Sequence, residues 1–141
     1  MIPRRQVCQW LGCAMVVGCA PEGPVDGIAD WPAADDPGWV EVTLPPALEN
    51  IGGQAVVSVP EALLEVVVVR RDEETVIAVW RICSHGACAL SWEDEETVFR
   101  CPCHGSEFDE DGAVLREPAS EGVRAFPAEL EGETLRIYRP L

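Results

Sequence analysis

The feature that most constrains this chain is a pair of short boxes in which cysteine and histidine recur at close spacing. The first box reads Cys-Ser-His-Gly-Ala-Cys over residues 83–88, and the second reads Cys-Pro-Cys-His-Gly-Ser over residues 101–106. The chain contains only two histidines, and each of them lies in one box. Thiolates and imidazoles are ligands of transition metals, so two such pairs on tight turns predict a metal centre. The predicted ligands are Cys83, His85, Cys101 and His104.

The donor set suits a two-iron cluster. Iron in a [2Fe–2S] cluster is usually held by thiolates, and replacing two of them with neutral imidazoles on one iron raises the reduction potential. Each box follows a predicted strand, so the strand ends would fix both loops. One iron would then take both cysteines, and the other iron would take both histidines.

Two other interpretations use the same residues. The four side chains would also suit a structural zinc site, although zinc would leave Cys88, Cys103 and Ser106 without a role. A scaffold held only by disulfides would need neither histidine.

The two boxes resemble those of the Rieske proteins, whose cluster signature is Cys-x-His and Cys-x-x-His with a spacer of this length. Here 15 residues separate His85 from Cys101, and the resemblance extends from about Gly52 to Tyr138. It implies one Rieske-type [2Fe–2S] cluster per chain. By the resemblance, Cys83 and Cys101 bind one iron, and His85 and His104 bind the other.

The resemblance also gives roles to neighbouring residues. Cys88 and Cys103 match the cysteines that form a disulfide between the two loops in the branch that includes cytochrome bc-type complexes. Ser106 matches a serine whose hydroxyl donates a hydrogen bond to a bridging sulfide, which raises the potential. Residues 117–119 match the proline loop that covers the cluster.

Two positions depart from the quinol-oxidising members of the family. Phe108 stands where many of them have a tyrosine that donates to a cysteine sulfur, so we expect a lower potential than theirs, within the Rieske range of about −150 to +300 mV. Gly86 replaces a leucine that shields their cluster and meets quinol, which argues against quinol oxidation.

The pattern of the remaining chain predicts an all-β domain over residues 39–141. Short valine-rich runs separated by turns predict about eight to ten strands, as in sandwiches and barrels. The run Val66–Val69 suits a strand buried on both faces. The resemblance implies a Rieske-type antiparallel β-sandwich or barrel with a small cluster-binding subdomain. The clearest predicted elements are strands at 39–44, 54–59, 64–70, 75–82, 97–100 and 113–115, one helical turn at 61–64, and a closing hairpin of 122–126 with 134–138.

The first 38 residues predict an export signal and a tether. Arg4 and Arg5 precede an uncharged apolar stretch too short to span a bilayer, so residues 1–18 fit a signal peptide. The arginine pair also loosely resembles a twin-arginine signal. Val16-Val17-Gly18-Cys19 resembles a bacterial lipobox, which implies lipidation of Cys19 after cleavage. Residues 19–38 are rich in proline, glycine and aspartate, and predict an acidic tether.

The formal net charge of −15 argues against a nucleic-acid partner, and it either favours a basic partner or only keeps the protein soluble. We therefore expect an exported electron carrier, on the periplasmic side of a bacterial membrane and bound to it through a lipid anchor only. Its partner would be a redox protein such as a basic cytochrome. Alternatives are a small electron-transfer subunit of a larger oxidoreductase, arsenite-oxidase-like or bc-type, or an oxygenase-linked ferredoxin. No stand-alone catalytic constellation accompanies the boxes.

Overall fold

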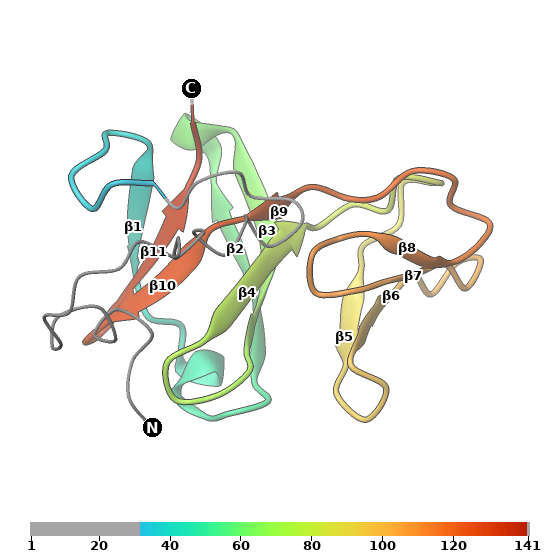
Figure 1. The fold of residues 1–141 in the computed structure, drawn as a ribbon, viewed down its shortest axis with the longest axis horizontal. Helices are drawn as coiled ribbons and strands as arrows, with labels where there is room; N and C mark the ends of the chain where they lie inside the picture. Colours follow the sequence, from blue (N-terminus) through green and yellow to red (C-terminus); the bar gives the residue numbers. More distant parts are fainter. Residues whose placement is uncertain (1–31, 141) are drawn as a thin grey trace, which may run out of the picture.

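The computed structural model describes residues 32–140, and all of its strand pairs are antiparallel (Figure 1). The strands form three sheets. The first has the order β1 (Trp39–Thr43), β11 (Thr134–Tyr138), β10 (Ala128–Glu131). The second has the order β2 (Gln54–Val59), β3 (Leu64–Arg70), β4 (Val76–Trp80), β9 (Ala125–Phe126). The third has the order β5 (Ser91–Glu93), β6 (Val98–Arg100), β7 (Glu107–Phe108), β8 (Val114–Arg116). Two single 3₁₀ turns, Pro46–Glu49 and Pro60–Ala62, precede β2 and β3.

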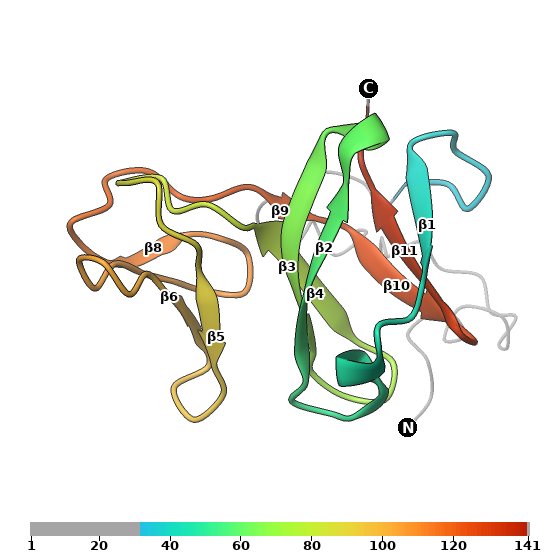
Figure 2. The ribbon, with the colours of Figure 1, turned by 180° about the vertical axis from the view of Figure 1, so that it is seen from behind.

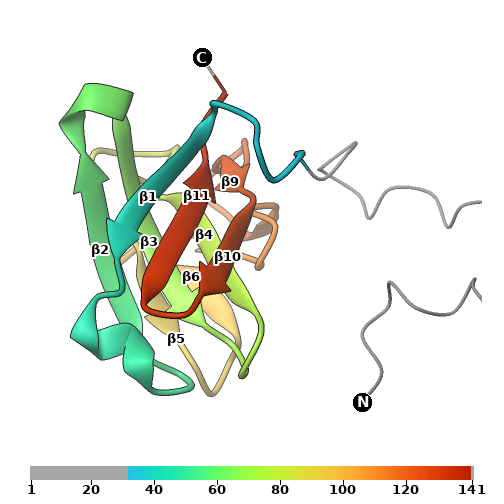
Figure 3. The same cartoon turned by 90° about the vertical axis from the view of Figure 1, so that its left-hand side faces the viewer.

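The first two sheets face each other and form a large lobe, while β5–β8 form a small lobe beside it (Figures 1 and 3). A buried apolar cluster fills the large lobe, with Val66 and Val68 of β3 on one side and Leu135 and Ile137 of β11 on the other. A second buried cluster lies between the small lobe and the middle sheet, and includes Trp92, Phe99 and Phe108.

β3 is the strand that belongs to both cores. Val66 and Val68 point into the large-lobe core, whereas Val67 and Val69 pack in the core of the small lobe. All four are at most 2% exposed. Alternate side chains of a strand point to opposite faces, so an unbroken run of valines buries apolar surface on both. The predicted burial of this run on two faces is confirmed.

The all-β class is confirmed, and so are the strands predicted at 54–59 and 64–70. The predicted closing hairpin is wrong in its first strand. β11 pairs with β10 across the turn at Gly132, with Glu131 opposite Thr134, and residues 125–126 instead pair with β4. Pro127 explains the error. It lacks an N–H group and separates β9 from β10, two short strands that the sequence pattern does not distinguish.

The end of the predicted tether lies against the large lobe. Arg136 donates a 2.6 Å hydrogen bond to the carbonyl of Ala34, and the Trp39 indole N–H donates to the carbonyl of Ala33 at 2.7 Å. The predicted signal peptide, Cys19 and the earlier part of the predicted tether lie outside the described residues. Within residues 32–140, no helix has the length and apolar character needed to cross a bilayer.

Candidate metal centre

The two boxes form closed turns at the outer end of the small lobe (Figures 1 and 2). In the first, the N–H group of Cys83 donates to the carbonyl of Cys88 at 2.9 Å. In the second, the N–H group of Cys101 donates to the carbonyl of Ser106 at 2.8 Å, directly after β6. Gly105 has a φ of 81°, a conformation that glycine adopts without steric cost, so this turn depends on that residue.

A disulfide between Cys88 and Cys103 joins the two boxes, with the Cα atoms 6.3 Å apart. This is the pairing that the resemblance implied. It closes a loop with a sequence separation of 15 residues, so it restricts the relative positions of the two turns in the unfolded chain as well as in the folded one.

The four predicted ligands come together as two pairs of like residues. The rings of His85 and His104 lie with centroids 4.9 Å apart and planes at 88°. The thiols of Cys83 and Cys101 are close enough to hydrogen bond, and both cysteines are free of disulfides. Within the described residues, no group of three or more metal-binding side chains converges on a single point. Each box supplies one thiol and one imidazole. Together the two thiols and two imidazoles fit the donor set of a two-iron cluster with mixed ligands.

The two pairs differ in their exposure. Cys83 and Cys101 are 4% and 1% exposed and belong to the core of the small lobe. His85 and His104 are exposed to solvent. The site therefore has a protein-facing thiol side and a solvent-facing imidazole side.

The surroundings of Cys83 favour its thiolate. Burial raises the pKa of this thiol, but hydrogen bonds from the backbone N–H groups of His85 and Gly86 lower it, as do the side chains of Cys101 and Ser106. The net effect is a pKa below the ordinary value. Because the thiolate is the form that binds metal, these hydrogen bonds suit Cys83 to the role of a metal ligand.

Ser106 is fully buried beside these thiols. Its hydroxyl oxygen accepts a 3.0 Å hydrogen bond from the N–H group of Ala119, itself 1% exposed. An oxygen that accepts from the backbone keeps its own proton for donation, and this proton lies within reach of the Cys83 sulfur. The Ala119 N–H group, in the predicted proline loop, positions the Ser106 hydroxyl. Sequence reasoning missed this contact, since every residue except proline has a backbone N–H group.

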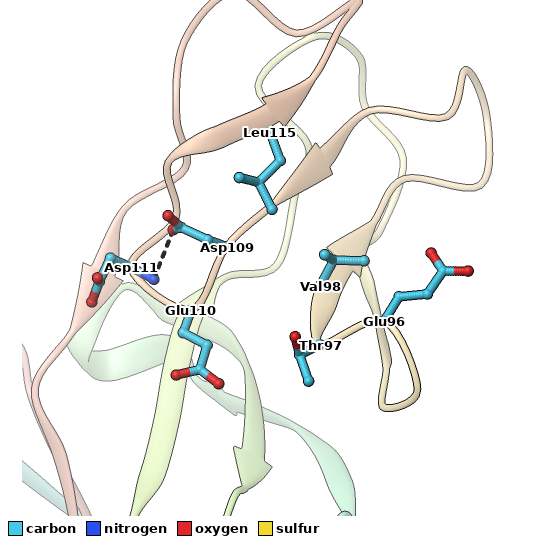
Figure 4. A pocket seen from close by; sticks show the side chains of 7 residues that line it. All are labelled: Glu96, Thr97, Val98, Asp109, Glu110, Asp111 and Leu115. Atoms are coloured by element: carbon cyan, nitrogen blue, oxygen red, sulfur yellow. Dashed lines mark hydrogen bonds between the residues drawn. The ribbon is translucent and has the colours of Figure 1, made fainter.

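A separate acidic groove of about 330 Å³ lies on the small lobe, away from the boxes (Figure 4). Of the acidic run 93–96, only Glu96 lines this groove, and it is ion-paired with Arg100. The groove also holds the turn at 109–111, where the N–H group of Asp111 donates to Asp109 at 2.9 Å.

Comparisons with known proteins agree with this geometry. The profile of the family described as "Rieske [2Fe-2S] domain" matches residues 39–127. The chain is 36% identical, over 56 residues, to the cytochrome b6-f complex iron-sulfur subunit of Synechococcus sp. strain JA-3-3Ab, a match that covers 40% of this chain and 33% of that protein. It is 53% identical over 38 residues to the corresponding subunit of Nostoc punctiforme, covering 27% of this chain and 21% of that protein. The chain thus matches no more than about a third of the length of these relatives.

Solved structures show the same fold. The cyanobacterial plasma membrane Rieske protein from Synechocystis PCC 6803 is 28% identical with a TM-score of 0.57, over 70% of this chain and 97% of that one. The ferredoxin of carbazole 1,9a-dioxygenase from Nocardioides aromaticivorans is 25% identical with a TM-score of 0.60, over 71% of this chain and 98% of that one. The chain therefore belongs to the Rieske [2Fe–2S] domain family, with a Rieske-type [2Fe–2S] cluster as its cofactor.

Proposed function

We propose that this protein passes single electrons between redox partners outside the cytoplasmic membrane. Cys83 and Cys101 would hold one iron of the cluster, and His85 and His104 would hold the other. When bound, the cluster accepts and releases one electron at a time. The observation that carries the proposal is the sorting of the four side chains into a buried thiol pair and an exposed imidazole pair.

The exposed imidazoles supply the exit route for the electron. Electron transfer needs close approach, and the thiol pair is covered by Phe99, Phe108 and the rest of the small-lobe core. His85 and His104 are exposed on the surface of the lobe. A partner would therefore dock over the histidine pair. The strongly negative chain would speed the approach of a basic partner, in a way that salt weakens.

Electron paramagnetic resonance of the dithionite-reduced protein tests the ligand set. Two imidazoles on one iron give a mean g-value well below that of an all-cysteine cluster, and we expect that spectrum with two irons per chain by metal analysis. An all-cysteine spectrum, or zinc in place of iron, would contradict the proposed ligands.

Lipid attachment at Cys19 is the second part of the proposal, and the lipobox Val16-Val17-Gly18-Cys19 supports it. Wild-type protein expressed in a bacterial host should enter the membrane fraction and gain the mass of acyl chains at Cys19. Cys19→Ser should remove that mass and release the protein. A wild-type protein that is cleaved and stays in the soluble fraction without added mass would disprove the anchor.

A second candidate function is service as the iron-sulfur subunit of a larger membrane complex. The relatives named as cytochrome b6-f complex iron-sulfur subunits favour it. Gentle detergent extraction separates the two cases, because a subunit migrates with its complex and a free carrier migrates at the mass of one chain.

Ser106 should set the potential of the cluster. Removing its hydroxyl in Ser106→Ala removes a hydrogen bond to a charged centre, worth about 1.5–3 kcal/mol, so we expect the potential to fall by about 60–130 mV. Protein-film voltammetry measures the change. The matched control is Ser84→Ala, since the Ser84 hydroxyl donates to the carbonyl of Glu121. Equal potentials for Ser106→Ala and wild type would exclude this role.

A further inference from the structure

The two boxes carry no charged residue, although the chain as a whole is strongly acidic. Neither 83–88 nor 101–106 contains an aspartate, a glutamate or an arginine. His85 and His104 are exposed there, together with Ala87 and Pro102. The surface from which an electron would leave the protein is therefore built from small and neutral side chains.

Gly86, next to His85, leaves open space on this surface. Apart from its two chain neighbours, no atom of the described residues lies within 4 Å of the position that a Cβ atom would take on it. Gly86 is also absent from the glycines with positive φ, so its backbone conformation does not require glycine. Its small size therefore leaves room for a second molecule to come close to His85.

The loop at 117–121 places two glutamates beside the boxes. The Ser84 hydroxyl of the first box donates to the carbonyl of Glu121 at 2.5 Å, and the N–H group of Ala119 donates to the Ser106 hydroxyl of the second box at 3.0 Å. Glu117 and Glu121 are exposed at the two ends of this loop. They form an acidic rim at the edge of the neutral surface.

The acidic rim is not neutralised by an arginine of the described chain. The ion pairs within residues 32–140 include neither Glu117 nor Glu121. Arg116 precedes Glu117 but is ion-paired with another glutamate, and Arg124 lies over the ring of Phe126 in the large-lobe core. Two carboxylates without ion pairs beside a neutral surface favour a positively charged partner at that edge.

The acidic run 93–96 lies at the opposite end of the small lobe. The first box precedes β5 and the second follows β6, so both boxes lie at one end of this antiparallel pair and the β5–β6 turn lies at the other (Figures 1 and 2). Each strand has three residues, which is about 10 Å of extended chain. In this run, Asp94 pairs with Arg71 and Glu96 pairs with Arg100. The run is thus both farther from the histidines and partly neutralised.

We propose that a basic redox protein docks on this surface, with its redox centre over His85 and His104 and its cationic side chains opposite Glu117 and Glu121. The inference rests on the proposed function and specifies the partner, whose contact surface is neutral at the centre and basic at the edge. Protein interfaces are depleted of charge at the core and polar at the rim, as this surface is. A neutral centre also lets the two proteins approach without the cost of desolvating charges.

Stopped-flow mixing of the reduced, cluster-loaded protein with ferric cytochrome c, a basic one-electron acceptor, tests the surface. One electron leaves the protein, which becomes oxidised, and reduces the haem iron from ferric to ferrous. At an ionic strength of about 0.1 M the screening length is about 10 Å, so charges near the contact dominate the rate. We expect Glu117→Gln/Glu121→Gln to lower the second-order rate constant at least threefold.

The matched control is Glu93→Gln/Glu95→Gln, which removes the same charge from the other end of the small lobe. It should change the rate constant with cytochrome c by less than about 1.5-fold. Ferricyanide supplies a test of opposite sign, because it is a small anion. Removing the acidic rim should speed the oxidation of the protein by ferricyanide at least twofold, whereas damage to the cluster would slow the reaction with both oxidants.

Two results with cytochrome c would overturn the docking surface. One is an unchanged rate constant for the rim variant, and the other is an equal fall for the control variant, which would assign the effect to net charge alone. Wild-type protein that shows the Rieske signal and reduces ferricyanide, but does not reduce cytochrome c, would also overturn the docking surface and leave the proposed function standing. Failure of the proposed function has a different sign, because the wild-type protein would then lack the Rieske signal.

Discussion

Replacing either histidine with alanine, as His85→Ala or His104→Ala, should give a protein that retains no Rieske cluster. The two imidazoles come from different loops, and each box supplies only one. No other histidine exists to take the vacant position. The iron that loses one of its two protein ligands would be open to solvent, because this side of the site is exposed. We expect iron and acid-labile sulfide to fall to background, and the reduced-state paramagnetic signal to disappear.

The control for this experiment is Ala87→Ser, which changes an exposed residue of the first box that is not a predicted ligand. It should keep the full iron content and an unchanged spectrum. A histidine variant with two irons per chain and the wild-type g-values would show that the imidazole is not a ligand. Circular dichroism distinguishes loss of the cluster from loss of the large lobe, which has its own core.

Removing the disulfide with Cys88→Ser/Cys103→Ser should lower the stability of the protein by about 3 kcal/mol, the chain-entropy value for a closed loop of about 15 residues. For a domain of roughly 100 residues, this corresponds to a fall of about 12–24 °C in Tm. The effect should concentrate in the small lobe, whose two boxes the bond joins. Loss of visible absorbance on heating measures it directly.

Reduction supplies the control. Treating the wild-type protein with a thiol reductant should reproduce the lowered melting temperature, and the same reductant should leave the double serine variant unchanged. A double variant that bleaches at the wild-type temperature would mean that the hydrogen bonds within each turn are enough to hold the boxes.

The residues of the predicted site are easier to recognise in the sequence than the strands around them. The boxes are contiguous and carry rare residue types, so Cys83, His85, Cys101 and His104 stand out without knowledge of the fold. The valine run of β3 is equally easy to recognise as a strand in the sequence, because an unbroken β-branched segment is rare outside a strand buried on both faces.

The errors fall where strands are short and their partners are distant in sequence. β7 and β9 have two residues each, too few for an alternating pattern to develop. The link between Ser106 and Ala119 uses a backbone donor. The pairing of Arg124 and Arg139 over Phe126 depends on the fold that brings residues 124 and 139 to one ring.

The valines of β3 have a consequence for how this protein can reach its partners. Because one strand supplies apolar side chains to both cores, the small lobe cannot swing away without exposing Val67 and Val69 to water. Burial of these two valines therefore opposes separation of the small lobe from the large lobe. Under the proposed lipid anchor, movement between donor and acceptor would have to be made by the domain as a whole, so the length of the predicted tether would set how far the cluster could reach.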